Sequence, residues 1–187
     1  MIKPYLKMKM VRKDFGETTM TLKEAGTFFC SWQNIGNVLF RIGKRWNGTK
    51  TYQEIGKIKV NYEFDFISIN KSHYGIYGFT HYPLVEYYIL ENYEGYIPSP
   101  FFGTFHVDGS NYDMFKDNFI LTNQIMTRIW SIRRKKRNKG SVSVTEHFKT
   151  REKYGYKLGK IYEVSFCVEG YKGFGNANIT KNEIIIE

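Results

Sequence analysis

The sequence is poor in cysteine and in the residues that best support helices. Among its 187 residues are two cysteines, Cys30 and Cys167, two alanines and seven leucines. Two cysteines are too few for a disulfide scaffold and lack the paired spacing of a metal site, so we expect free thiols and no metal. The shortage of alanine and leucine disfavours a helical fold.

Long apolar runs are also absent. No stretch approaches the roughly 20 apolar residues that a membrane-spanning helix needs, and the first seven residues carry charge without the apolar core of a signal peptide. We therefore expect no membrane partner. The length, with no internal repeat or linker, predicts one domain over residues 1–187. On this reading the protein is either intracellular or has lost its signal.

Positive charge is abundant, with 28 Lys and Arg against 18 Asp and Glu and a formal net charge of +10. This balance admits nucleic acid, a membrane surface or an acidic polymer as a partner. The densest run, residues 133–139, has six basic residues in seven. Such runs are usually solvated faces, so we expect no nucleic-acid binding and favour attraction to an acidic polysaccharide or to an anionic cell surface.

Aromatic residues dominate what is present, with 15 Tyr, 15 Phe and 3 Trp. Aromatic side chains favour pleated surfaces, so the composition predicts an all-β fold. Residues 58–66 alternate apolar and polar positions strictly, which is typical of a strand with one buried face. Further strands are expected at 27–32, 37–42, 74–79, 84–91, 101–107, 125–133, 141–144, 161–169 and 176–186. Many short strands indicate a sandwich or barrel, and one helix is expected from a Thr145 cap to a Gly155 stop.

Two glutamates lie in unusually apolar surroundings. Glu86 is flanked in 83–89 by Pro, Leu, Val, Tyr and Ile, and Glu169 follows the apolar stretch 164–168. A charge in the middle of such a strand is unfavourable unless it is paired or functional. Two of them are reminiscent of the carboxylate pair of a glycosidase. The alternative is that either lies on a solvated face or pairs with a structural arginine.

Several motifs, in order along the chain, resemble family 11 glycoside hydrolases, the small endo-1,4-β-xylanases. Pro83-Leu84-Val85-Glu86-Tyr87-Tyr88-Ile89 is similar to the nucleophile motif, and Val168-Glu169-Gly170-Tyr171 to the acid/base motif. The other matching stretches are 28–37, 77–80, 130–133 and 147–148. The resemblance covers roughly residues 10 to 186, and ordered motifs are more specific than a single match.

The resemblance implies a β-jelly roll of two curved antiparallel sheets with a single helix. It implies a secreted, monomeric enzyme that needs no cofactor and cuts xylan internally with retention of configuration. Glu86 would be the nucleophile and Glu169 the acid/base. We expect Glu86 to stay ionised while burial and its charged neighbour keep Glu169 protonated near neutral pH.

The same resemblance places further residues in the substrate-binding site. Tyr77 and Tyr88 match tyrosines that contact the reacting sugar and the nucleophile, and Asn37 matches the position beside the acid/base. An asparagine there is associated with optima nearer neutral or alkaline pH, so we expect a neutral optimum. The remaining expected substrate contacts are Phe79, Arg128, Trp130 and Tyr171.

Some positions depart from the family pattern. Arg12 aligns with the first stacking tryptophan, Phe79 replaces another tryptophan, and the thumb stretch 116–125 is short and lacks its usual arginine. Phe119 takes that arginine's place, while Arg128 replaces a glutamine two residues before Trp130.

Two hypotheses follow from these departures. In the first, Arg128 supplies the missing cation beside Glu86 and the enzyme is active. In the second, the altered thumb no longer clamps substrate, and the protein is a weakened or specificity-shifted β-glycan-binding relative. We expect the first because both glutamates and both tyrosines are kept.

Overall fold

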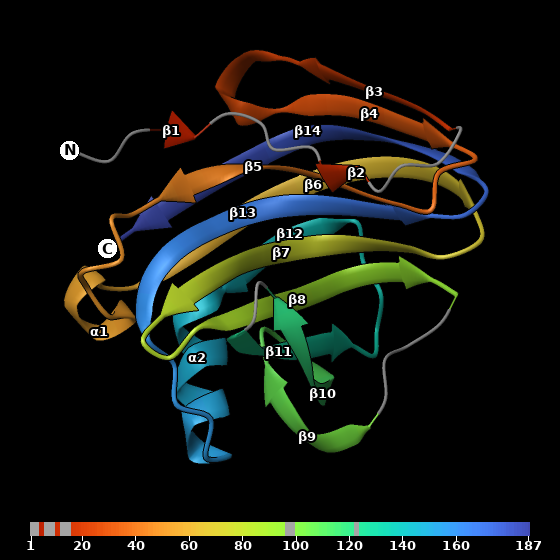
Figure 1. Ribbon diagram of the computed structural model, residues 1–187. Coiled ribbons are helices and arrows are strands. Elements are labelled where there is room, and N and C mark those ends of the chain that lie inside the picture. The colour runs from red at the N-terminus through yellow and green to blue at the C-terminus, as the bar shows by residue number, and fades with distance from the viewer. Residues whose placement is uncertain (1–3, 6–9, 12–15, 96–99, 122–123) are drawn as a thin grey trace.

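The chain is built from two β-sheets that pack face to face, as the computed structural model shows in Figure 1. The structure describes residues 4–5, 10–11, 16–95, 100–121 and 124–187. The larger sheet has nine strands in the order β1-β5-β13-β7-β8-β11-β10-β9, with β2 also pairing to β5. Its strands are β1 Pro4–Tyr5, β2 Met10–Val11, β5 Asn37–Arg45, β7 Ser72–His81, β8 Val85–Glu94, β9 Phe101–Val107, β10 Ser110–Leu121, β11 Gln124–Arg133 and β13 Lys160–Tyr171.

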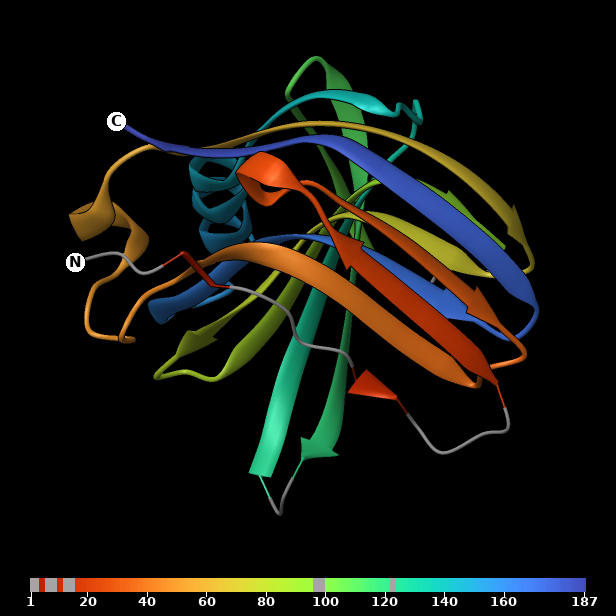
Figure 2. The ribbon, with the colours of Figure 1, turned by 90° about the horizontal axis from the view of Figure 1, so that it is seen from above.

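The smaller sheet has five strands in the order β12-β6-β14-β4-β3. They are β3 Glu17–Leu22, β4 Phe28–Gln33, β6 Ile58–Ile69, β12 Lys139–Ser143 and β14 Phe174–Ile186. The strands curve strongly, and the hairpin of β10 and β11 projects beyond the rest of the larger sheet (Figure 2). The predicted jelly roll of two curved sheets is confirmed. Among the described strands, pairing is antiparallel except between β8 and β11, which run parallel.

Strand β6 shows why the sequence forms this sandwich. Ile58, Val60, Tyr62 and Phe64 are all buried, and the residues between them are less so. The alternation predicted for 58–66 is therefore the inner and outer face of a strand in the smaller sheet. Strands β1, β2, β3 and β10 were not among the predicted ones.

The space between the sheets is filled largely by aromatic rings. Phe64 stacks on Tyr74 across the two sheets at a centroid distance of 5.3 Å, and Tyr62 stacks on Phe166 at 5.4 Å. Buried tyrosine hydroxyls need partners. Those of Tyr62 and Tyr112 both donate to the fully buried carboxylate of Glu91. The core thus accommodates tyrosine because a buried acid accepts its hydrogen bonds.

The predicted helix forms but starts earlier than expected. Helix α2 covers Val144–Lys153, and its N-cap is Ser143, whose hydroxyl accepts from the amide of Glu146. Thr145, the expected cap, accepts instead from the amide of Ile58 at 2.8 Å, which ties the helix to β6. Phe148 is fully buried in the main core. Within the described residues, no helix is long and apolar enough to span a bilayer.

Two smaller elements were not predicted. The one-turn helix α1, Tyr52–Ile55, begins with a capping box in which Thr51 and Glu54 satisfy each other's backbone. The 3-10 helix η1, Glu24–Gly26, lies between β3 and β4.

The basic run of 133–139 is tied into the fold by acidic partners. Arg137 pairs with Glu91 at 2.5 Å, and Arg134 pairs with Asp113 at 2.8 Å. Lys136 and Lys139 lie within ion-pair distance of Glu94 and Glu63, and Arg133 is buried and donates to the Tyr112 hydroxyl. Most of this run therefore serves structure.

Candidate active site

The outer face of the larger sheet, which points away from the smaller sheet, carries a second and smaller apolar cluster. We call it the site face; its buried apolar residues are Leu39, Tyr77, Tyr88, Leu90, Trp130, Ile132 and Cys167. Their neighbours along each strand belong instead to the core between the sheets. Because side chains alternate along a strand, Glu86 and Glu169 share the site face with this cluster. They are 4% and 6% exposed.

Glu86 lies on β8 between two donors that the sheet supplies. The Tyr77 hydroxyl on β7 donates to Oε1 at 2.8 Å. Arg128 is the register partner of Glu86 on the parallel strand β11, and its Nε donates to Oε2. The guanidinium also lies 4.0 Å from the Phe119 ring centroid, which covers it from β10. Both carboxylate oxygens therefore accept a hydrogen bond, one of them from a cation.

Glu169 lies on β13 with a different set of donors. The side-chain amide of Asn37 on β5 donates to Oε1 at 3.0 Å, and Tyr171 donates from the same strand. His73 Nδ1 on β7 lies 3.4 Å from Oε2. Glu169 thus has neutral donors and one imidazole, whereas Glu86 has a permanent cation.

Sheet curvature brings the two carboxylates together. On β7 their register partners, His73 and Phe79, are six residues apart. A flat sheet would hold the glutamates far from each other, yet the charge of Glu169 contributes to raising the pKa of Glu86. The curved strands seen in Figure 2 therefore gather two acids into one site.

Comparison with known proteins agrees with this arrangement. The family described as glycosyl hydrolases family 11 matches residues 5–180. The chain belongs to glycosyl hydrolase family 11. It is 40% identical over 180 residues to endo-1,4-β-xylanase A of Bacillus pumilus, covering 93% of this chain and 79% of that protein.

Two further relatives define how far the family likeness extends. Endo-1,4-β-xylanase A of Thermoclostridium stercorarium is 46% identical over 182 residues, which are 93% of this chain but 28% of that longer protein. The structure of the family 11 xylanase from Neocallimastix patriciarum superposes with a TM-score of 0.91 at 25% identity, covering 100% of this chain and 95% of that one.

In this family 11 chain the pKa of Glu86 is raised and that of Glu169 is lowered, which is opposite to the expectation of an ionised Glu86 and a protonated Glu169. Burial raises the pKa of Glu86, and the attraction of Arg128 and the Tyr77 hydrogen bond only partly oppose it. Burial also acts to raise the pKa of Glu169, but the hydrogen bond and charge of His73, with Asn37 and Tyr171, outweigh it and lower the pKa. The reason is His73, a residue that the sequence analysis did not place at the site.

The structure gathers the other expected substrate contacts around the two acids. Tyr88 packs edge-on against Tyr77 at 4.9 Å and stacks on Trp130 at 5.9 Å. Phe79 lies edge-on to Tyr77 at 5.2 Å and opposite Glu86 in register. Tyr77, Tyr88 and Trp130 are buried in this cluster, and Phe79 is partly exposed.

Two departures in the sequence have different outcomes. Arg12 lies outside the described residues. The thumb region is the hairpin of β10 and β11, where Ile120 and Ile125 are register partners and are 74% and 75% exposed. Phe119 on this hairpin covers the guanidinium of Arg128, which reaches Glu86 from strand β11.

Sequence reasoning missed a third buried acid near the site face. Glu163 is fully buried, and Arg41 and Arg45 each lie 3.1 Å from one of its oxygens. The Arg41 guanidinium in turn lies 4.7 Å from the Tyr77 ring centroid. The sequence did carry a signal for this ion pair. Arg41 and Glu163 are each a charged residue within a mostly apolar strand segment.

Cys167 on the site face is free and buried, as expected, and burial raises its thiol pKa well above the usual range. The thiol therefore stays protonated and unreactive.

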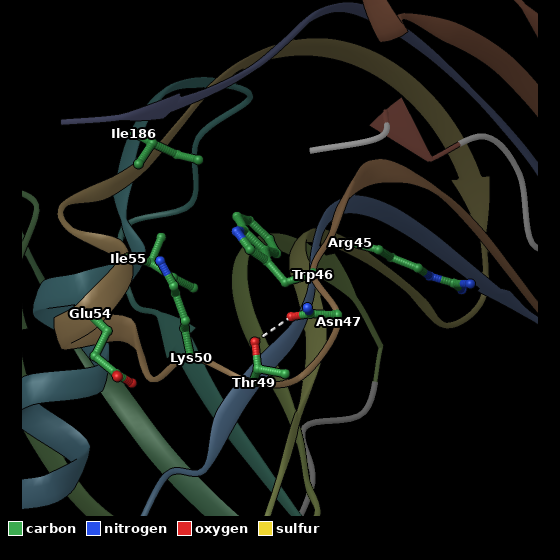
Figure 3. Close-up of a pocket in the computed structure, with 8 residues that line it drawn as sticks. All are labelled: Arg45, Trp46, Asn47, Thr49, Lys50, Glu54, Ile55 and Ile186. Carbon is green, nitrogen blue, oxygen red and sulfur yellow. Dashed lines mark hydrogen bonds between the residues drawn. The ribbon is translucent and has the colours of Figure 1, made fainter. Parts of the chain in front are cut away.

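A separate hollow of about 340 Å³ lies at the connection between β5 and α1 (Figure 3). Trp46, Lys50, Glu54 and Ile186 are among its lining residues, and Thr49 donates to the Asn47 side chain at its rim at 2.6 Å. Neither Glu86 nor Glu169 lines it, so it is distinct from the site face.

Proposed function

We propose that this chain is a retaining endo-1,4-β-xylanase in which Glu86 is the nucleophile and Glu169 the acid/base. The observation that carries the proposal is the pair of buried carboxylates on one face, each with its own donors, within a family 11 chain. Relatives at 40% and 46% identity are named endo-1,4-β-xylanases. A retaining glycosidase needs two such acids in different environments.

In the first step, an Oε of Glu86 attacks C1 of the xylose unit on the glycone side. The C1–O bond to the leaving chain breaks, and the proton of Glu169 passes to the departing oxygen. Tyr77 and Arg128 hold the Glu86 carboxylate in place and favour its ionised form. The product is a xylosyl ester of Glu86 and a shortened chain with a free hydroxyl.

In the second step, Glu169 acts as base. Its carboxylate takes a proton from water, the resulting hydroxide oxygen attacks C1, and the ester bond to Glu86 breaks. Two inversions at C1 give overall retention. The donors from Asn37 and His73 suit this step, because they stabilise the carboxylate form of Glu169.

The position of Arg128 bears on the two hypotheses about the altered thumb. Its contact with Glu86 supports the hypothesis that a cation from β11 replaces the missing thumb arginine. We therefore favour an active enzyme over a protein that only binds β-glycan.

The substrate implies where the protein works. Xylan is a polymer too large to cross a membrane, so we propose that the protein acts outside the cell. We further propose a monomer with xylan as its partner, without cofactor or metal, and without nucleic acid as a ligand.

The test compares xylan hydrolysis by the wild type, Glu86→Gln and Glu169→Gln. Each replacement keeps the shape of the side chain and removes its ionisable oxygen. We expect activity to fall by about 100- to 10,000-fold for loss of the acid/base, and at least as far for loss of the nucleophile. Wild-type activity in Glu86→Gln would end the assignment, and xylan binding without hydrolysis by the wild type would favour the binding-protein hypothesis.

A further inference from the structure

His73 is a buried histidine whose side chain is directed at Glu169. It is 2% exposed on β7, directly opposite Glu169 in the register of β7 and β13. Its Nδ1 lies 3.4 Å from Glu169 Oε2. While Glu169 is ionised it can only accept hydrogen bonds, so in that state Nδ1 carries the proton that joins the two groups.

The remaining contacts of His73 leave it with a single hydrogen-bond partner. The ring packs edge-on against Tyr171 at 5.3 Å, which fixes its plane. Its other nitrogen, Nε2, is buried and has no partner among the described residues. The imidazole is therefore committed to Glu169, and a structural role in linking other elements is not available to it through hydrogen bonds.

The groups around this pair determine how its proton is held. On β5, Asn37 donates to Oε1 of Glu169. The charged and titratable groups that face the pair come from its own strands, from β8 and β11, and from the β6–β7 turn. They are Tyr171 and Cys167 on β13, Tyr93, Tyr88 and Glu86 on β8, Arg128 on β11, and Lys71 in the turn.

Among the described groups that donate to Glu169, which are Asn37, Tyr171 and His73, the imidazole is the one whose protonated form carries a positive charge. The tyrosines and the buried thiol carry no charge near neutral pH, since burial raises their pKa values. Arg128 is engaged with Glu86.

We propose that His73 is a positioning residue that limits the pH range of catalysis, by orienting the Glu169 carboxyl group and weakening its hold on the proton that the leaving chain needs. The proposal rests on the proposed function, because it assigns His73 a role through the acid/base. The pKa of Glu169 is consistent with this role. Burial acts to raise it, and His73 contributes most to lowering it.

The experiment follows kcat/KM from about pH 4 to pH 9 on xylohexaose, whose leaving sugar needs a proton. The variants are His73→Phe, which keeps the ring and removes both nitrogens, and His73→Asn, which keeps a neutral donor near Nδ1. On the alkaline side, we expect the pH of half-maximal kcat/KM to rise by about one unit in the Phe variant. The rise should be smaller in the Asn variant.

The matched control is His106→Phe, an exposed histidine on β9 that contacts Asn111. Its profile should superimpose on the wild type. A purely structural loss in His73→Phe would lower kcat at every pH without moving the profile, and that result would overturn the proposal. Should the Phe variant not fold, an unmoved alkaline half-point in His73→Asn would overturn it equally.

A second substrate separates this inference from the proposed function. With 2,4-dinitrophenyl β-xylobioside the leaving group needs no proton, so the shift should vanish; a shift of equal size there would contradict a route through Glu169. Glu169→Gln should lose activity on xylohexaose yet release a burst of dinitrophenol. If it does so while His73→Phe leaves the profile unmoved, only the role of His73 fails. If it loses activity equally on both substrates, the acid/base assignment itself fails.

Discussion

Removing the guanidinium of Arg128 should make the proposed enzyme fail first at acidic pH. Arg128 donates to Glu86 Oε2, and its attraction opposes the effect of burial, which raises the pKa of that carboxyl. In Arg128→Ala, Tyr77 remains as a donor but the cation is gone. The pKa of Glu86 must therefore rise, and a protonated Glu86 cannot attack C1.

The size of the effect follows from the exposure of the pair. An opposite charge in contact shifts a carboxyl pKa by about one to three units. The Arg128 side chain is 28% exposed and that of Glu86 6%, so water partly screens the pair and the lower end applies. We expect the acidic limb of kcat/KM to move up by about one pH unit, which is about a tenfold loss at pH values below the limb.

The assay is the initial rate of aryl β-xylobioside hydrolysis across pH, where proton donation is not required and the nucleophile is isolated. Arg128→Lys should shift the limb less than Arg128→Ala, because it keeps a charge but loses the planar guanidinium. Arg134→Ala, which removes an exposed ion pair with Asp113, is the control and should leave the limb in place. Coincident acidic limbs for the wild type and Arg128→Ala would refute the electrostatic role.

Three further predictions concern the scaffold. Phe148→Ala should destabilise the fold by about 3 to 5 kcal/mol in urea unfolding, because the ring is fully buried in the main core, against Tyr52 and Tyr87; a loss below about 1 kcal/mol would mean that the core collapses around the gap. Gly170→Ala should lower Tm, since its Cβ would lie 2.5 Å from Trp32 ring atoms, and an unchanged Tm would show that the ring can move aside. Burial lowers the pKa of His147, which lies 3.3 Å from Asp108. The unfolded chain then takes up a proton first, so stability should fall as pH drops below about 6.5, and this fall should be weaker in His147→Gln; equal pH dependence in both would contradict it.

The sequence predicts the sandwich well because the signal is local. Alternation in 58–66 records burial residue by residue, and it marks the inner face of β6. The helix is also local, yet its start is displaced because Thr145 bonds to Ile58, a partner that lies 87 positions away and is invisible in the pattern. Helix α1 had a visible signal in the capping box of Thr51 and Glu54, which the sequence analysis did not use.

The candidate site divides in the same way. The two glutamates and Arg128 can be predicted, because strand alternation places Arg128 and Trp130 on one face and family motifs set the strand order. The contact of His73 with Glu169 depends on the register between β7, which ends at His81, and β13, which begins at Lys160. No spacing rule relates residues 96 positions apart, so a decisive neighbour of the acid/base could not be found before the fold was known.

The parallel pairing of β8 and β11 makes the cation beside Glu86 independent of the length of the β10–β11 hairpin. Glu86 and Arg128 are held side by side by the ladder itself, and the intervening chain leaves and returns through β9 and β10. In the proposed enzyme, a change in the length of the β10–β11 hairpin would therefore leave the cation beside the proposed nucleophile in place.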